Sequence, residues 1–194
     1  MSISRRDVLK SLTMGALAGL VLRVIPAEAA EYAHRAVAFE KKSNPAYKPK
    51  FFSPHQYKSL QALCDAIIPK DERSGGALQA GAPELIDLLT SENTDYQVQL
   101  AGGIQWLDSA CEDRYGRVYL EASPDQQKQI LDLISFRRNA ATHAGLSQGV
   151  EFFRFLRNLT TDAYVTSEVG IKDLGYVGNT FLLDFPGCPP VPDR

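Results

Sequence analysis

The stretch SPHQYKSLQALCDAIIP, residues 53–69, decides the fold class because it carries a helix together with its start and stop signals. Ser53 is a typical N-cap residue, and Pro54 suits the first helical position, where a backbone N–H is not needed. Apolar side chains then recur at helical spacing, at Tyr57, Leu60, Cys64 and Ile67. Pro69 ends the pattern. The stretch therefore predicts an amphipathic α-helix.

The same spacing of apolar residues predicts four further helices, over about residues 83–90, 94–115, 123–143 and 147–169. Ser123 and Gln126 are a predicted capping box at the start of the third of these. Gly102 and Gly103 fall inside a helix, and we interpret them as the place where a neighbouring helix of the same domain lies close. No long alternation of apolar and polar residues is present. The sequence therefore predicts an all-α fold, a single small domain of about five helices over residues 53–169.

Two segments that flank this domain lack a helical pattern. Residues 30–52 show no sustained period and end in NPAYKPKFF, so we predict an extended arm there. Residues 170–194 are rich in glycine and proline and end in FPGCPPVPDR, which has few N–H groups to donate. We predict a second arm over this C-terminal segment. Arms of this kind can become ordered on a partner and cover a large surface from a small domain.

Residues 1–29 have the three parts of an export signal. These parts are a basic start with Arg5, Arg6 and Lys10, an apolar stretch over residues 12–22, and the small-x-small site Ala27-Glu28-Ala29. The apolar stretch is shorter than the roughly 20 residues that span a bilayer, so we do not expect a permanent membrane anchor. We predict cleavage after Ala29.

The paired arginines indicate a particular export route. The residues that match the twin-arginine consensus S-R-R-x-F-L-K are Ser4, Arg5, Arg6, Leu9 and Lys10. Val8 stands where the consensus has Phe. The alternative is an ordinary secretory signal that happens to contain two arginines. Because the twin-arginine route carries folded proteins, often with a cofactor, we expect a cofactor in this chain or in a companion.

The net charge bears on the class of partner, and the cysteine content bears on whether a disulfide can form. The chain has 194 residues and a formal net charge of −2, which fits one ordinary domain and argues against a nucleic-acid partner. Cys64, Cys111 and Cys188 permit one disulfide in an exported protein. Alternatively, Cys64 and Cys111 are small buried residues on apolar helix faces, and we favour this interpretation.

Catalytic and cofactor motifs are missing from the sequence. It contains no G-x-G-x-x-G, no P-loop and no G-x-S-x-G. His34, His55 and His143 are far apart, and of the E-x-x-H pairs that a di-iron site requires only Glu31 with His34 has the spacing. The sequence therefore predicts no catalytic, cofactor-binding or metal-binding residue.

Two pairs of carboxylates remain as candidates for acid–base chemistry. Asp71 and Glu72 are adjacent after Pro69, and Asp162 and Asp173 are the second pair. A charged loop is more often simply solvated, so we favour a surface role for the first pair. Asp162 can equally pair with a nearby arginine.

Six strings over the domain show a resemblance to a known family. They are LCDAIIPKDE (63–72), AGAPELID (80–87), WLD with YG (106–116), PDQQKQILDLI (124–134), FFRFLRNLTTDAY (152–164) and TSEVGIKDLGYVGN (166–179). Together they make the chain resemble the gluconate 2-dehydrogenase subunit 3 family, the small subunits of periplasmic flavin-dependent sugar and alcohol dehydrogenases. Ala163 departs from the pattern, in which we expect glycine.

The resemblance implies a protein without a cofactor of its own. Such a small subunit binds a large FAD-containing subunit of the glucose-methanol-choline type that lacks an export signal. The twin-arginine machinery then carries both folded proteins to the periplasm, and the complex can be associated with the membrane. Electrons pass from the flavin to a cytochrome c subunit or another acceptor. On this interpretation the paired arginines serve the partner.

The string GYVGN is the candidate partner contact, because glycines let two backbones approach closely. The predicted contact residues are Tyr164, Gly175, Tyr176, Gly178 and Asn179. The alternative for this string is an ordinary turn after the last helix. Two further hypotheses for the whole chain stay open. One is a free-standing periplasmic enzyme that uses Asp71, Glu72 or a thiol, and the other is a helical ligand-binding protein.

Overall fold

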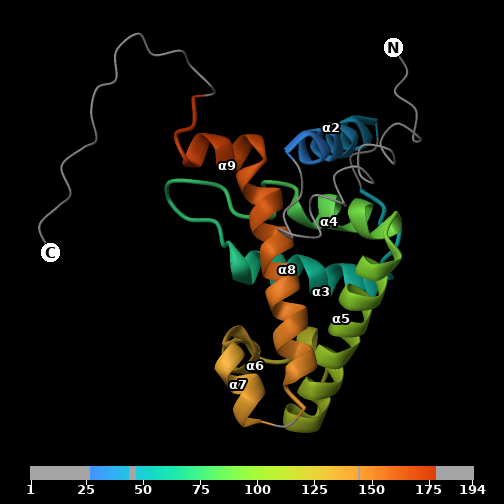
Figure 1. Ribbon diagram of the computed structural model, residues 1–194, viewed down its shortest axis with the longest axis vertical. Coiled ribbons are helices and arrows are strands. Elements are labelled where there is room, and N and C mark those ends of the chain that lie inside the picture. The colour runs from blue at the N-terminus through green and yellow to red at the C-terminus, as the bar shows by residue number, and fades with distance from the viewer. Residues whose placement is uncertain (1–26, 44–46, 144, 178–194) are drawn as a thin grey trace, which may run out of the picture.

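The predicted helices are present in the computed structural model, which describes residues 27–43, 47–143 and 145–177 (Figure 1). They are α3 (Pro54–Ile67), α4 (Ala82–Ser91), α5 (Thr94–Tyr115), α6 (Pro124–Ser135) with α7 (Arg137–Thr142), and α8 (Ser147–Val165) with α9 (Glu168–Asp173). A short 3-10 helix, η1 (Tyr119–Glu121), precedes α6. The described residues contain no β-strand, and the all-α prediction is confirmed.

Helices α3 and α6 start with the same hydrogen-bonded capping motif. The Gln56 N–H donates to Ser53 Oγ over 3.3 Å, and the Ser53 N–H donates to Gln56 Oε1 over 3.1 Å. Ser123 and Gln126 form the same pair of bonds, at 3.3 and 3.0 Å. Each box satisfies two N–H groups that have no partner inside the helix. The capping box predicted at Ser123 is confirmed, and Ser53 has a second one.

The predicted helix over residues 123–143 is divided at Phe136, whose backbone is extended. Asn139 donates its side-chain N–H to the Leu133 carbonyl over 2.8 Å, and Ser135 donates its hydroxyl to the Leu131 carbonyl over 2.7 Å. These side chains bond to carbonyls near the end of α6, where a continuous helix would supply backbone N–H groups. The chain can therefore turn into α7 with those carbonyls satisfied.

The extended arm predicted over residues 30–52 is wrong for residues 30–43, which belong to helix α2 (Ala27–Ser43). Alanine has the highest helix propensity, and the buried side of α2 consists of small residues, Ala29, Ala30, Ala33 and Val37. Small side chains let α2 lie close against α4. A stripe of alanines is weakly apolar, which is why the helical period was not recognised. Residues 47–52 form no helix or strand.

The predicted boundary of the C-terminal arm at residue 170 is also wrong, because residues 170–173 lie in α9 and Gly170 is buried. The prediction for residues 178–194 lies outside the described residues, as do the export-signal residues 1–26. Cys188 belongs to this group as well.

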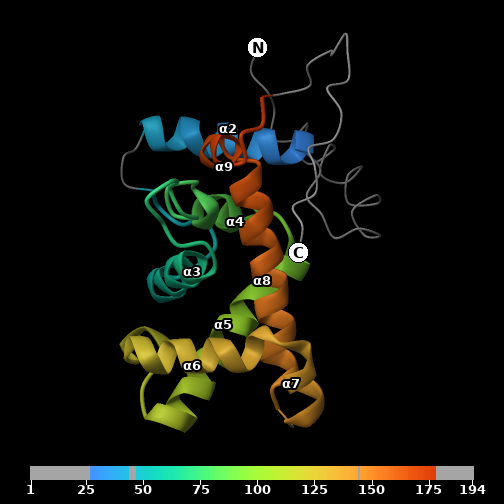
Figure 2. The same ribbon diagram turned by 90° about the vertical axis from the view of Figure 1, so that its left-hand side faces the viewer.

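Helix α8 is the element around which the others are arranged (Figures 1 and 2). It packs against α3, α4, α5, α6, α7 and α9. Helices α6 and α7 lie at one end of it, and α2 and α9 lie at the other. The buried residues of α8 include Phe152, Phe153, Leu156 and Leu159, which place its apolar side in the core. The long axis of the molecule therefore follows α8.

Helices α5 and α8 each place an aromatic ring against a glycine of the other. A Cβ built on Gly103 would lie 1.9 Å from the Phe152 ring, and one built on Gly149 would lie 2.1 Å from the Trp106 ring. Real Cβ atoms do not approach other atoms so closely, so both rings depend on the missing side chain. The interpretation of Gly103 as a helix-packing residue is confirmed, whereas a Cβ on Gly102 would meet nothing within 4 Å.

The adjacent residues Gly102 and Gly103 offer a matched pair of substitutions. Gly103→Ala is expected to lower the free energy of unfolding by about 1–3 kcal/mol, because the new methyl group forces Phe152 to move. Gly102→Ala meets no atom and is expected to stabilise the helix by up to about 1 kcal/mol. Urea denaturation of the two purified variants, followed by circular dichroism, measures both. Equal stability of the two variants would contradict the packing described here.

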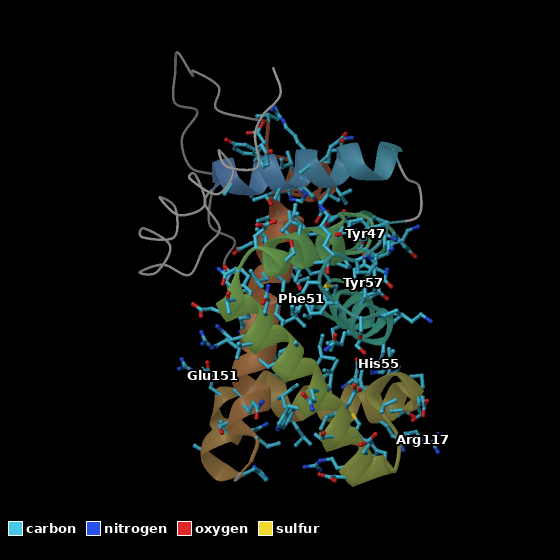
Figure 3. All side chains as sticks on the ribbon, turned by 90° about the vertical axis from the view of Figure 1, so that its right-hand side faces the viewer. Tyr47, Phe51, His55, Tyr57, Arg117 and Glu151 are labelled. Atoms are coloured by element: carbon cyan, nitrogen blue, oxygen red, sulfur yellow. The ribbon has the colours of Figure 1, made fainter. Side chains whose placement is uncertain are left out.

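The buried carboxylate of Asp87 holds residues 47–52 against α4. Its Oδ2 accepts the Tyr47 hydroxyl over 2.8 Å and the Lys50 N–H over 2.6 Å. Its Oδ1 accepts the N–H groups of Phe51 and Phe52, each over 3.1 Å. The ring of Tyr47 also lies against that of Tyr57 on α3, with centroids 5.8 Å apart (Figure 3). The Asp87 clasp, meaning Asp87 with these four donors, therefore fixes the entry into α3.

Candidate partner-binding surface

Large apolar side chains are exposed where α8 ends and α9 follows. They are Val165, Ile171, Leu174, Tyr176 and Val177, which we call the α9 surface. Leu174 is 63% exposed and Val177 is 86% exposed. Single exposed apolar residues are common on soluble proteins, whereas a group of them often marks a contact site. Five of the seven large apolar side chains that are exposed in the described part of the chain belong to this segment.

The turn between α8 and α9 is built by Ser167 and Gly170. The Ser167 hydroxyl donates to the Tyr164 carbonyl over 2.7 Å and accepts the Gly170 N–H over 3.0 Å, which caps α9. A Cβ on Gly170 would lie 2.0 Å from the Tyr164 carbonyl oxygen. Only glycine allows the chain to pass this carbonyl. The turn thereby sets the direction in which α9 leaves α8.

Tyr164 fastens α9 to the loop that follows α3. Its hydroxyl donates to Asp173 Oδ2 over 3.0 Å and lies 2.8 Å from Ser74 Oγ. The side chain of Tyr164 is buried, so the structure uses this predicted contact residue inside the chain. Through Asp173 the Tyr164 side chain holds α9 in place. Its direct contact with a partner stays a prediction.

Gly175 and Tyr176 lie at the end of α9, as part of the same surface. Gly175 has a φ of +64°, a left-handed conformation that favours glycine, and its N–H donates to the Lys172 carbonyl over 3.1 Å. The glycine therefore ends a helix, as the alternative interpretation of GYVGN proposed. Tyr176 is 56% exposed. Gly178 and Asn179 lie outside the described residues.

Helix α2 is joined to this end of the molecule by His34. Its Nε2 lies 2.9 Å from the Thr166 hydroxyl oxygen, which itself donates to the Asp162 carbonyl over 2.6 Å. Since that hydroxyl proton is already used, the His34 Nε2 atom is the donor. Burial lowers the pKa of His34 below its ordinary value. A backbone hydrogen bond to Ala163 opposes this shift, and sequence reasoning missed both contacts because their partners are far from His34 in the chain.

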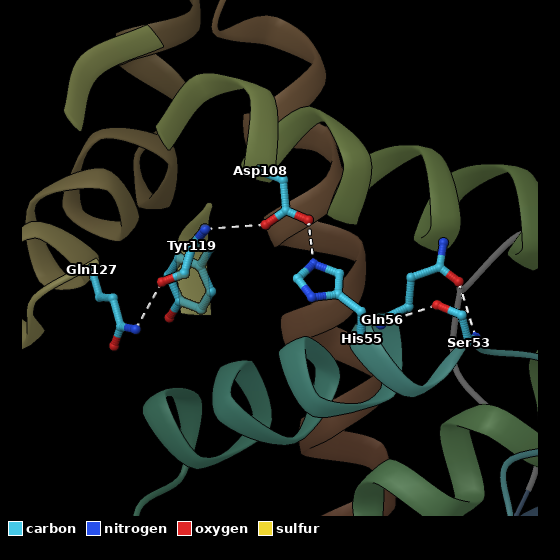
Figure 4. A network of polar contacts seen from close by, with 6 residues as sticks. All are labelled: Ser53, His55, Gln56, Asp108, Tyr119 and Gln127. Carbon is cyan, nitrogen blue, oxygen red and sulfur yellow. Dashed lines mark hydrogen bonds and ion pairs between the residues drawn. The ribbon is translucent and has the colours of Figure 1, made fainter. Parts of the chain in front are cut away.

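A second polar network surrounds Asp108 on α5 (Figure 4). Its Oδ2 lies 2.7 Å from His55 Nε2, and its Oδ1 accepts the Tyr119 N–H over 3.1 Å. A histidine oriented by aspartate can act as a general base. Among the described residues, no hydroxyl or thiol is hydrogen-bonded to His55. Asp108 instead links α3 and η1 to α5, a role that the sequence did not indicate.

The residues considered for a free-standing enzyme are placed in structural roles. Asp71 is exposed and accepts the N–H groups of Ser74 and Arg73 over 2.7 and 2.8 Å, and these bonds lower its pKa. Burial raises the pKa of Cys64 to about 12 and that of Cys111 to about 11. Both cysteines are free and buried, which confirms the favoured interpretation. The upward shift favours the protonated thiol, whereas a nucleophile requires the thiolate.

Within residues 27–43, 47–143 and 145–177, no group of three or more His, Cys, Asp or Glu side chains is placed to hold a metal ion. His143 lies at the exposed end of α7. In the same part of the chain, no helix combines the length and the apolar character needed to cross a membrane.

The described residues thus form a small helical protein with exposed apolar side chains at and after α9. The sequence profile of the family described as gluconate 2-dehydrogenase subunit 3 matches residues 54–187. The chain belongs to this family, as the resemblance indicated. The match begins at the first residue of α3 and includes all of α9. No match was found among curated proteins or among solved structures.

Proposed function

We propose that this chain is a non-catalytic small subunit of a flavin-dependent sugar or alcohol dehydrogenase. It binds and stabilises a large FAD-containing subunit of the glucose-methanol-choline type, and its twin-arginine signal exports the two folded proteins together to the periplasm. The α9 surface carries this proposal, because exposed apolar residues in a dehydrogenase subunit call for another protein to cover them.

The size of the α9 surface suits an anchor for such a contact. Leu174, Tyr176 and Val177 are each more than half exposed, and full burial of a large apolar side chain contributes about 1.5–3 kcal/mol. Aromatic residues at the centre of an interface often dominate its energy. The capped turn at Ser167 and the support from Tyr164 hold these side chains in place before binding, which lowers the entropy cost of association.

The proposed electron transfer and export follow from the different roles of the two subunits. Flavin chemistry and substrate specificity belong to the large subunit, and electrons continue to a cytochrome c subunit or another acceptor. A large subunit that folds around FAD in the cytoplasm needs an export route for folded proteins. The paired arginines, Arg5 and Arg6, provide the signal for that route.

Co-expression with a tagged large subunit tests the contact surface. Leu174→Lys is expected to reduce the amount of small subunit that co-purifies by at least about tenfold, because a buried unpaired ammonium opposes an apolar contact. Val98→Lys is the matched control, since Val98 is 71% exposed but lies on α5. We expect this control to bind like the unchanged chain.

Two results would count against the proposed surface. One is co-purification of Leu174→Lys in full amount, and the other is a loss of binding by Val98→Lys as large as that of Leu174→Lys. Circular dichroism of each small subunit shows whether the variants are equally helical, so that loss of folding is recognised separately.

A further inference from the structure

The expected cleavage site for the export signal lies inside a helix. Cleavage after Ala29 would break the bond between Ala29 and Ala30, and α2 begins at Ala27. The side chains of Ala29 and Ala30 are 5% and 1% exposed and form part of the hydrophobic core, together with Ala33. The bond is therefore covered on the side that faces the domain.

A protease has to reach the backbone of the bond that it cuts. Proteases bind an extended segment and bond to its N–H and C=O groups, whereas a helix uses these groups internally. Cleavage sites accordingly concentrate in exposed, poorly ordered segments. A bond in a packed helix is cut only from the fraction of molecules in which the helix has opened.

Contacts with α4 and with the end of α8 keep α2 packed against the domain. Ala33 and Val37 are buried on the side facing α4, and the His34 ring is hydrogen-bonded to Thr166 at the end of α8. Figures 1 and 2 show α2 lying across this end of the molecule beside α4 and α9. Release of the first turn of α2 thus exposes Ala29 and Ala30, which otherwise lie in the core.

We propose that the docking of α2 shields the bond between Ala29 and Ala30 from signal peptidase, so that the folded chain keeps residues 1–29. The shield requires that the chain folds before it is exported. On this point the inference rests on the proposed function. A protein exported in the folded state reaches the peptidase with α2 already docked. A chain exported unfolded would present the same bond in an open segment.

The experiment uses the purified full-length chain and purified signal peptidase in detergent. The native chain is expected to be cut at least about tenfold more slowly than the same chain held unfolded during the assay, in a urea concentration at which the peptidase still cuts a short control peptide. The mass of the product locates the cut. Ala33→Asp places an unpaired carboxylate on the buried side of α2 and is expected to speed cleavage of the folded chain at least about tenfold.

Ala38→Asp is the matched control, because it introduces the same side chain at an exposed position of α2. It is expected to be cut as slowly as the unchanged chain. Cleavage of the native chain as fast as the unfolded chain would overturn the proposal, and so would resistance of both. The comparison of native with unfolded chain needs no variant. It therefore tests the protection of the bond even if Ala33→Asp fails to fold.

Failure of this inference can be distinguished from failure of the proposed function. The cleavage assay contains no large subunit and no export machinery, so it gives the same answer whether or not the chain carries a passenger. In cells, intact-mass analysis of the exported chain then shows whether residues 1–29 are retained. Complete removal of these residues from the exported chain would contradict the shield in its cellular setting.

Discussion

Replacement of Asp87 by alanine is expected to lower the free energy of unfolding by about 3–5 kcal/mol. The substitution removes the acceptor for three backbone N–H groups and the Tyr47 hydroxyl. A buried donor left without an acceptor costs about 1–3 kcal/mol, and the total is limited because residues 47–52 can detach and be solvated. Urea denaturation of the purified chain measures the change.

Two further variants separate the clasp from a general effect of lost charge. Tyr47→Phe removes one of the four hydrogen bonds and is expected to cost about 1 kcal/mol. Asp65→Ala removes an exposed carboxylate from the neighbouring α3 and is expected to change the stability by less than about 0.5 kcal/mol. An Asp87→Ala chain as stable as the Asp65→Ala chain would show that the clasp contributes nothing.

If the proposed function holds, replacement of both Arg5 and Arg6 by lysine is expected to abolish export of the small subunit and of the proposed FAD-containing large subunit. The charge is unchanged, but guanidinium offers a planar fork of five donors and ammonium offers a point charge, so a receptor for the pair can distinguish them. An ordinary secretory signal requires only positive charge and tolerates the exchange. The measurement is dehydrogenase activity in the periplasmic and cytoplasmic fractions.

Arg23→Lys is the matched control, because it makes the same exchange in the same segment but outside the twin-arginine consensus. It is expected to leave the distribution of activity unchanged. If the double-lysine chain delivers normal activity to the periplasm, the joint export of the two subunits is excluded. Activity that stays in the cytoplasm with both variants would instead indicate a general sensitivity of the signal.

Local sequence signals predicted most of the helices because their causes are local. Ser53-Pro54 and Ser123-Pro124 start helices through bonds within four residues, and Gly116 ends α5 in a left-handed conformation. The division at Phe136 was missed, since it depends on which carbonyls Ser135 and Asn139 select. Such a choice between competing hydrogen bonds cannot be derived from the spacing of apolar residues.

Features that depend on distant contacts were not predicted. Helix α2 was missed because its buried side consists of alanines, which become a recognisable stripe only when α4 lies against them. Asp87 stands in the apolar stretch APELIDLLTS and resembles a surface position of an amphipathic helix, whereas α4 is buried on nearly all sides. Two carboxylates, Glu84 and Asp87, in an otherwise mostly apolar helix were the available signal.

The candidate surface was predicted in part. The GYVGN string directed attention to the end of α9, where Gly175 and Tyr176 lie, and its contact with a partner stays a prediction. Ile171 and Leu174 were not identified, because exposure depends on how α9 leaves α8. That direction follows from the contact between Gly170 and the Tyr164 carbonyl, which belongs to the three-dimensional structure.

The paired insertion of Phe152 against Gly103 and of Trp106 against Gly149 restricts how the molecule can deform. Sliding α5 along α8 would drive each ring into the backbone or side chain of the next residue, so shear between these two helices is blocked. This packing opposes sliding of α5 relative to α8. We therefore expect any rearrangement on binding a partner to involve the helices at the two ends of α8, which are α2 with α9 and α6 with α7.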